Sequence, residues 1–167
     1  MSSERELIRI VDRAMAEAES KAGGWLACRP GCCECCLGPF PISELDALRL
    51  RRGLEDLERS QPGRAARVAE SARRIAARGG MTDDEPCPAL DPETGTCDLY
   101  QARPLTCRTF GPPVRGADGA LAICELCFQG ASEDEIAACA VDLDIDALEA
   151  EGEDTLVAFA LCEDGGQ

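Results

Sequence analysis

The spacing of apolar residues predicts a helix at the start of the chain. From Ser3 to about Lys21, apolar side chains recur every three or four residues, and Ser3 with Glu6 matches a capping box. Gly23 and Gly24 are expected to end this helix. The residues expected to face the core are Leu7, Ile10, Val11, Ala14 and Ala18.

Two more helices are predicted before residue 81. Ser43 can cap a helix that continues to about Arg59, and Pro62 suits the first turn of another that ends at Gly79 and Gly80. The expected core positions are Leu45, Leu48 and Leu54 in the first helix and Val68, Ala72, Ile75 and Ala76 in the second.

Four arginines share another face of the second of these helices. Arg64, Arg67, Arg74 and Arg78 recur at helical spacing. One interpretation is a phosphate-binding ridge. We favour a solvated face, or one that docks on acidic residues of the same chain, because charged rows on helices usually face solvent.

The pattern changes between Met81 and about Phe128. Prolines, glycines and cysteines interrupt every segment, and only brief extended pieces such as "TCDLY" and "ALAIC" fit. A loop region of this length needs something to order it inside a compact domain, and metal ligation would do so.

Helical spacing returns near the C-terminus. Ser132 and Glu135 match a second capping box, and a last short helix is predicted from about Asp154 to Leu161. Cys139 falls on the apolar stripe and is expected to be a buried core residue, while Cys162 is expected to be a bystander at the helix end. The stripe comprises Ile136, Ala140, Leu143 and Ala147.

Charge and hydropathy restrict the partners and the compartment. Residues 1–80 carry 14 basic and 12 acidic side chains, a net of +2, whereas residues 81–167 carry 3 and 20, a net of −17. An acidic half of this kind should repel nucleic acid and anionic membranes. The charged start lacks the apolar core of a signal peptide, and no stretch is long enough to span a membrane. We therefore expect a cytoplasmic protein, where structural disulfides rarely persist.

Cysteine is the dominant chemical feature of this chain, which has 12 cysteines, no histidine and only 4% aromatic residues. "CRPGCCECC" contains two overlapping C-x2-C pairs, and "CELC" at Cys124–Cys127 forms a third. The adjacent Cys35 and Cys36 are expected to point apart and to serve different metals or bridge two. Cys87 lies between prolines, Cys97 follows the turn "DPETGT", and Cys107 follows "ARPLT". Disulfides, core thiols and a redox pair are alternatives, but clustered cysteines in a reducing compartment favour metal ligation.

Nearby charged residues add to this site. Arg103 and Arg108 could offset thiolate charge, or could form ordinary surface salt bridges. Glu44 is the carboxylate that we would test first as a ligand or a neighbour of ligands, although stabilisation of a helix N-terminus is the favoured interpretation. The acidic run Asp83, Asp84 and Glu85 is expected to be solvated.

Together these features predict a mainly α-helical fold, a small helical domain around a loop-rich, cysteine-ligated metal centre with little regular sheet. We expect an N-terminal helix over residues 1–24, a cysteine-cluster domain with two inserted helices over 25–130, and acidic helices packed on it over 131–167.

Two blocks of the sequence resemble a known family. "CRPGCCECC" followed by "LGPFPISELDAL", and "PCPALDPETGTCDLYQARPLTCRTF", are similar to the CxxCxxCC zinc- or iron-chelating domain family, the YkgJ-type cysteine cluster proteins. The resemblance covers residues 25–128. It matches Cys28, Cys32, Cys35, Cys36, Cys87, Cys97, Tyr100, Arg103, Pro104, Cys107 and Arg108, and leaves Cys33 as an extra thiol. It implies metal binding and, for many members, an iron–sulfur oxidoreductase label, but no settled reaction.

The ligand set and the metal follow from both arguments. The candidate ligands are Cys28, Cys32, Cys35, Cys36, Cys87, Cys97, Cys107, Cys124 and Cys127. They would fill two four-thiolate sites, or one cluster and one zinc site. Without histidine, zinc would be bound by thiolates alone or with a carboxylate, and cysteine-only ligation also suits iron–sulfur clusters. The cysteine excess slightly favours iron or an iron–sulfur cluster over zinc.

Three functions fit this composition. The first is a module whose metal ions hold the fold together and mediate contacts with a protein partner. The second is an iron–sulfur oxidoreductase or electron carrier, and the third is metal storage or delivery. Whether the chain is an enzyme stays open, because no nucleophile and base are evident.

Overall fold

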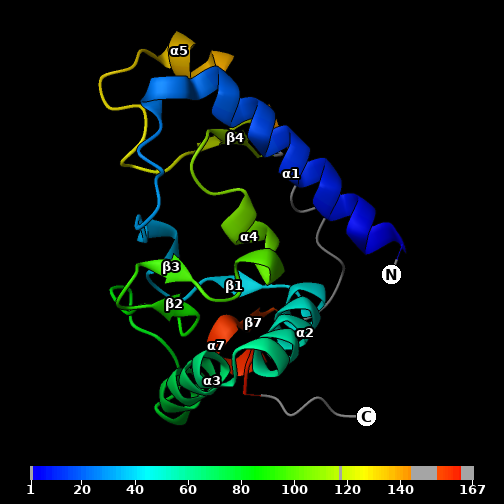
Figure 1. The fold of residues 1–167 in the computed structure, drawn as a ribbon. Coiled ribbons are helices and arrows are strands. Elements are labelled where there is room, and N and C mark those ends of the chain that lie inside the picture. The colour runs from blue at the N-terminus through cyan, green and yellow to red at the C-terminus, as the bar shows by residue number, and fades with distance from the viewer. Residues whose placement is uncertain (1, 117, 144–153, 163–167) are drawn as a thin grey trace. The chain divides into compact units, whose positions relative to one another are not determined.

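A computed structural model describes residues 2–116, 118–143 and 154–162. The fold is mainly α-helical with only short strands, as predicted (Figure 1). Within the described residues, 2–29 and 105–143 form one compact unit, called unit 1, and 30–104 with 154–162 form another, called unit 2. No described helix is both long and apolar enough to cross a membrane.

Unit 1 is organised around its N-terminal helix. α1 buries Val11, Met15, Ala18 and Ala22, which follow one another at three- and four-residue steps. The prediction that Ile10 faces the core is wrong, because it lies about 100° away from Val11 around the helix and is 51% exposed. The elements of unit 1 are α1 (Ser2–Ala22), η1 (Gly23–Trp25), α4 (Leu105–Arg108), β4 (Val114–Arg115), β5 (Leu121–Ala122), α5 (Glu133–Ala138) and β6 (Val141–Asp142).

The helix predicted after Ser132 is much shorter than the sequence pattern indicates. The capping box of Ser132 and Glu135 is present, yet α5 ends at Ala138. Val141 then donates a backbone hydrogen bond to Pro113 and enters β6, which pairs in parallel with β4. Sheet pairing therefore replaces the predicted continuation through Ala140 and Leu143, and Ala147 lies outside the described residues.

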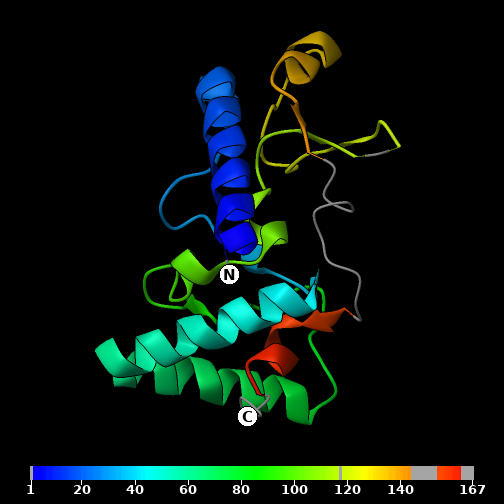
Figure 2. The ribbon, with the colours of Figure 1, turned by 90° about the vertical axis from the view of Figure 1, so that its right-hand side faces the viewer.

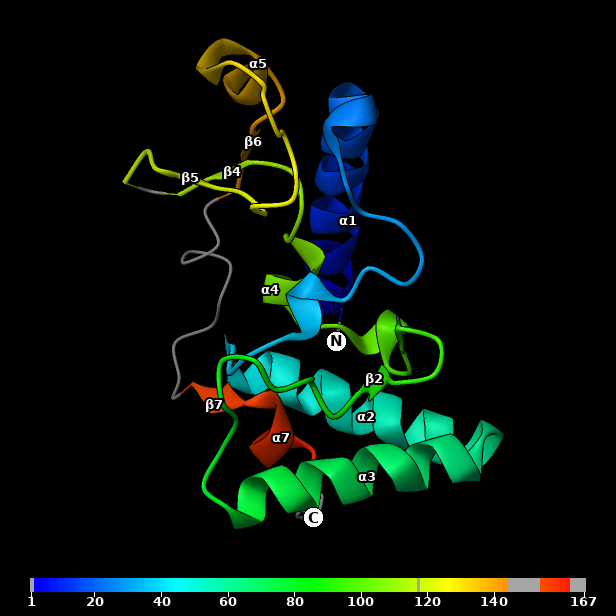
Figure 3. The ribbon, with the colours of Figure 1, turned by 90° about the vertical axis from the view of Figure 1, so that its left-hand side faces the viewer.

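Unit 2 is built on a helical hairpin. α2 and α3 lie side by side, and α7 packs against both (Figures 2 and 3). Ser43 caps α2 as predicted, accepting a hydrogen bond from the backbone of Asp46. The elements of unit 2 are η2 (Glu34–Cys36), β1 (Pro41–Ile42), α2 (Glu44–Ser60), α3 (Pro62–Ala77), β2 (Leu90–Asp91), β3 (Thr96–Cys97), η3 (Tyr100–Ala102), β7 (Thr155–Leu156) and α7 (Val157–Ala160).

The core of unit 2 differs from the prediction at two points. Leu45 is 37% exposed, because the buried stripe of α2 passes through Ala47, Leu50 and Leu57 instead. The last helix begins at Val157 rather than near Asp154, since β7 pairs with β1. The apolar face of α3 is as expected, with Val68, Ala72 and Ile75 fully buried.

The arginine face of α3 docks on acidic residues of its own chain. This was one of the two alternatives that we favoured over a phosphate-binding ridge. Arg64 and Arg67 both pair with Asp98, and Arg78 pairs with Glu85. Arg74 lies 4.0 Å from the same Glu85 carboxylate. Three arginines of α3, and Arg78 at its C-terminal cap, thus lie against the two ends of the segment 85–98, which carries Cys87 and Cys97.

The close approach of α2 to η3 gives a test of this packing. Gly53 faces Ala102, and a Cβ added to Gly53 would overlap the Ala102 side chain. Gly53→Ala should therefore destabilise the protein by about 1–3 kcal/mol through overpacking, even though alanine favours a helix by about 1 kcal/mol. The measurement is urea unfolding followed by circular dichroism.

Gly63→Ala on α3 is the matched control. Nothing lies within 4 Å of a Cβ added at Gly63, so this variant should be at least as stable as the parent. Equal stability of the two variants would contradict the contact between α2 and η3.

Candidate metal centre

Two distant segments of unit 2 run antiparallel where they carry cysteines. The Cys87 backbone N–H donates to the Cys36 carbonyl at 2.6 Å, and the Gly38 N–H donates to Glu85 at 2.9 Å. Leu37 and Pro86 form the bridge between these hydrogen bonds. The backbone therefore places Cys36 directly beside Cys87, which is 51 positions later in the sequence.

A short hairpin adds Cys97 to the same place. β2 and β3 pair Leu90 with Cys97, and the Leu90 N–H donates to the Cys87 carbonyl at 2.9 Å. Gly95 allows the turn between the strands, because its φ is 66° and an added Cβ would stand 3.1 Å from the backbone of Gly31. The same close approach brings the segment that leads into Cys32 and Cys33 against the hairpin turn.

The adjacent Cys35 and Cys36 do not point apart. They lie in the 3-10 turn η2, where the Cys36 N–H donates to the Cys33 carbonyl at 2.8 Å, and their thiols are hydrogen-bonded to each other. The expectation that they diverge is wrong because the 3-10 turn brings the two thiols within hydrogen-bonding distance. Both sulfurs are available to one centre.

The thiols of Cys35, Cys36, Cys87 and Cys97 form one interacting group, called the unit 2 thiol group. The hydrogen bond from Cys36, helped by the positive charge of Arg103, lowers the pKa of Cys35 to about 7. The same hydrogen bond, burial and the charges of Cys35, Cys87 and Cys97 raise the pKa of Cys36. Burial raises the pKa of Cys87 to about 12 and also raises the pKa of Cys97, in both cases with a contribution from other thiols of the group.

A cation stands beside this group. The Arg103 guanidinium stacks 3.6 Å above the ring of Tyr100, and its charge lowers the pKa of both Cys35 and Cys97. Arg49 donates to the Arg103 carbonyl at 3.5 Å and pairs with the fully buried carboxylate of Asp46. The structure therefore supports the expected role of Arg103 as a partner for thiolate charge.

The acidic residues are used differently from the sequence-based interpretation. Glu44 is exposed in the first turn of α2, consistent with stabilisation of the helix N-terminus. Glu85 is paired with arginines rather than solvated, while Asp83 and Asp84 are exposed. Sequence reasoning missed the buried Asp46 and Asp98. The Ser43–Asp46 capping spacing and the row of arginines on α3, which needs acidic partners, were the signals that could have found them.

Unit 1 gathers a second set of cysteines. The Ala27 N–H donates to the Cys127 sulfur at 3.4 Å, and the Phe128 N–H donates to the Trp25 carbonyl at 2.8 Å. The Cys124 N–H donates to the Gly111 carbonyl at 3.4 Å, and a Cβ added to Gly111 would stand 3.0 Å from the sulfur of Cys28. Cys28, Cys124 and Cys127 are thus drawn together by backbone contacts.

The positions of Cys107 and Cys139, the other described cysteines of unit 1, do not by themselves show whether they are ligands. Cys107 is half-buried on α4, and its neighbour Arg108 makes a bidentate ion pair with Asp12 at 2.8 and 3.0 Å. Cys139 is buried, as predicted, in the apolar cluster that also contains Cys124 and Cys127. Burial alone therefore does not separate ligands from core thiols in this unit.

The described residues fit a soft metal by the chemistry of their donors. Within residues 2–116, 118–143 and 154–162, no three cysteine or carboxylate side chains already stand at the corners of a coordination shell. The backbone nevertheless holds the unit 2 thiol group together, with one thiol already inclined to ionise. Thiolates are the ligands that zinc and iron–sulfur clusters accept most readily, so the donor chemistry of this group suits either kind of centre.

Comparison with known proteins agrees with this chemistry. Residues 27–128 match the family model CxxCxxCC, described as "Putative zinc- or iron-chelating domain". No curated protein and no solved structure gives a significant match.

The pKa values predict an order of thiol reactivity in the metal-free protein. At pH 7.5, Cys35 should be largely thiolate and Cys87 almost entirely thiol, so iodoacetamide should modify Cys35 at least about 100 times faster. Fragmentation mass spectrometry of time points assigns each modified cysteine.

Changing the pH provides the control for this experiment. The rate at Cys35 should fall as the pH decreases through about 7, because the thiolate becomes protonated there. Similar rates at Cys35 and Cys87, or no pH dependence at Cys35 in this range, would be inconsistent with a proton shared between Cys35 and Cys36.

Proposed function

We propose that this chain, which belongs to the CxxCxxCC family of zinc- or iron-chelating domains, binds a zinc or iron centre through Cys35, Cys36, Cys87 and Cys97 of unit 2. The observation that carries the proposal is the contact between the segments of these four thiols: the Cys87 N–H donates to the Cys36 carbonyl, and Cys97 pairs with Leu90. The pKa values of the four thiols also depend on one another. They come from three segments that the backbone has already brought together. Cys32, on the segment that approaches the hairpin turn, is a further candidate ligand of this unit.

The bound metal would hold segments of the chain together, a role that buried apolar side chains play elsewhere. A bound ion supplies positive charge that ionises the thiols and cross-links the segments carrying them. Four thiolates and one divalent ion leave a net charge of about −2. Arg103 stands where it would offset part of that charge, because it already acts on Cys35 and Cys97.

Unit 1 has the residues for a second centre. We propose Cys28, Cys107, Cys124 and Cys127 as its ligands. Three of them are gathered by backbone contacts, and the N–H of Ala27 already donates to a sulfur, as backbone amides commonly do around bound thiolates. Cys139 is proposed to be a core thiol, and the partition follows the two compact units.

The identity of the bound metal would distinguish between a structural, a redox and a storage role. Zinc would support a structural module, because zinc has no redox chemistry. Iron with acid-labile sulfide and a brown visible spectrum would support an oxidoreductase or electron carrier. The test is anaerobic purification of the full chain, followed by visible spectroscopy and measurement of zinc, iron and sulfide per chain. A folded protein without either metal would refute the proposed function.

Single substitutions should distinguish ligands from other thiols of unit 2. Cys87→Ser and Cys97→Ser should each reduce the metal bound per chain by the content of one centre, because serine is a poor ligand for these ions at neutral pH. The measurement is elemental analysis of protein purified under one protocol.

Cys162→Ser is the matched control, because Cys162 packs at the edge of the same apolar cluster as Cys87 and Cys97. This variant should retain all of its metal. Equal metal loss in the three variants would show that serine acts by disturbing the core rather than by removing a ligand.

Metal removal should loosen the cysteine-bearing loops before the helices. After chelation, amide hydrogen exchange should rise most in residues 81–104, which have only short strands and turns, while α2 and α3 stay protected by their own core. Exchange measured by mass spectrometry checks this, and an unchanged exchange pattern in residues 81–104 would exclude a structural role for the metal.

A further inference from the structure

The carboxylate of Asp98 is fully buried immediately after Cys97. Its side chain is 0% exposed, and its two oxygens are paired with two different guanidiniums, Oδ1 with Arg64 and Oδ2 with Arg67. Burying a carboxylate costs free energy unless its charge is paired, and the pairing with two arginines offsets that cost. It attaches the residue after Cys97 to α3.

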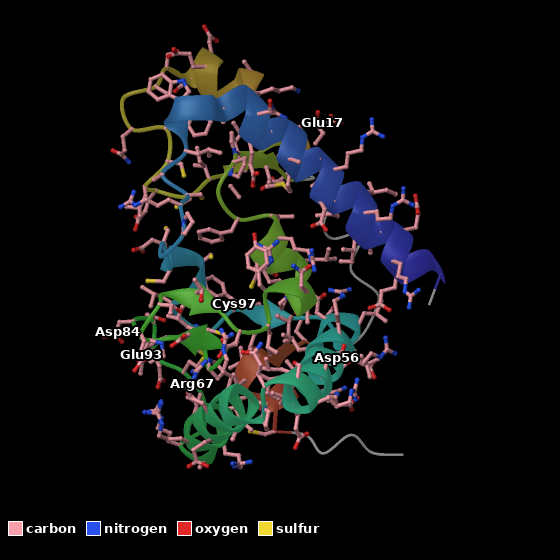
Figure 4. All side chains as sticks on the ribbon, viewed as in Figure 1. Glu17, Asp56, Arg67, Asp84, Glu93 and Cys97 are labelled. Carbon is pink, nitrogen blue, oxygen red and sulfur yellow. The ribbon has the colours of Figure 1, made fainter. Side chains whose placement is uncertain are left out.

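Arg67 makes a second contact that extends this attachment. Its Nη1 donates to the Leu90 carbonyl at 2.9 Å, while its Nη2 pairs with Asp98. Leu90 is the strand partner of Cys97, and its N–H donates to the Cys87 carbonyl. One guanidinium therefore holds both strands of the hairpin, and Figure 4 shows Arg67 on α3 reaching toward the hairpin that carries Cys97.

We propose that Arg67 and Asp98 are positioning residues of the unit 2 centre, an inference that rests on the proposed function. The planar guanidinium fork fixes the separation between the Leu90 carbonyl and the Asp98 carboxylate, and hence the backbone that presents Cys87 and Cys97. Neither residue touches the metal. They act through the hairpin, as outer residues do when they orient ligands.

The same pairing limits the availability of the Asp98 carboxylate as a ligand. Asp98 is the carboxylate nearest in sequence to Cys97, and a free carboxylate can bind zinc alongside thiolates. The ion pairs with Arg64 and Arg67 compete with a metal for Asp98; the Oδ2 contact with Arg67 is also a hydrogen bond, whereas Oδ1 accepts none in the described structure. The arginines thereby reduce the competition of this carboxylate with the thiolates, which are the ligands that soft ions prefer.

The test compares zinc affinity and cobalt spectra of full-length variants. Arg67→Ala and Asp98→Asn should each weaken zinc binding at the unit 2 centre about 10- to 100-fold, measured by competition with a chromophoric chelator. Cobalt(II) spectra should also change in the thiolate charge-transfer bands that are lost in Cys97→Ser, which identifies the bands of this centre. If Arg67→Ala does not fold, Asp98→Asn carries the test, because it preserves side-chain shape.

Arg73→Ala is the matched control. Arg73 lies on the same helix, where it makes an exposed ion pair with Glu70, so the affinity and cobalt spectrum of this variant should equal those of the parent. The inference is overturned if Arg67→Ala and Asp98→Asn bind zinc like Arg73→Ala. It is also overturned if they lose stability in the metal-free state but keep the parental cobalt spectrum, since that is a purely structural role. A parent protein that binds neither zinc nor cobalt would instead refute the proposed function itself.

Discussion

Unit 2 depends on the ion pairs between α3 and the segment 85–98. This segment has only two-residue strands, so its own hydrogen bonds cannot hold it. Arg64 and Arg67 hold its end at Asp98, and Arg78 holds its start at Glu85. Because Cys87 and Cys97 lie between these two points, the charged face of a helix helps to position the sulfurs, together with the backbone contacts to Cys36 and the apolar cluster beneath them. A phosphate-binding role for Arg67 is incompatible with these contacts.

The thiols of unit 2 combine two opposing tendencies. Burial disfavours ionisation of Cys87 and Cys97, whereas the hydrogen bond from Cys36 and the charge of Arg103 favour it at Cys35. The group is therefore ready to release a first proton near neutral pH but resists releasing the others. A metal ion is the kind of charge that would overcome this resistance, and binding would be coupled to proton release.

Much of the fold follows from local signals. The capping residues Ser43 and Ser132 and the stripe of Val68, Ala72 and Ile75 were all predictable, because they depend on neighbours in the sequence. The predictions failed where a distant segment intervened. β6 and β7 formed where a helix was predicted, because each pairs with a strand from a distant part of its own unit. The resemblance in "CRPGCCECC" predicted the cysteine chemistry, but not which sulfurs meet.

The donor chemistry and the helices could be predicted without coordinates, because cysteine content and apolar spacing are properties of residues and their near neighbours. The interaction of Cys35 and Cys36 with Cys87 and Cys97, and the burial of Asp98 against Arg67, are visible only in the folded chain. These contacts join residues tens of positions apart. Their geometry depends on a 3-10 turn, a glycine at positive φ and the orientation of α3, none of which is visible in spacing alone.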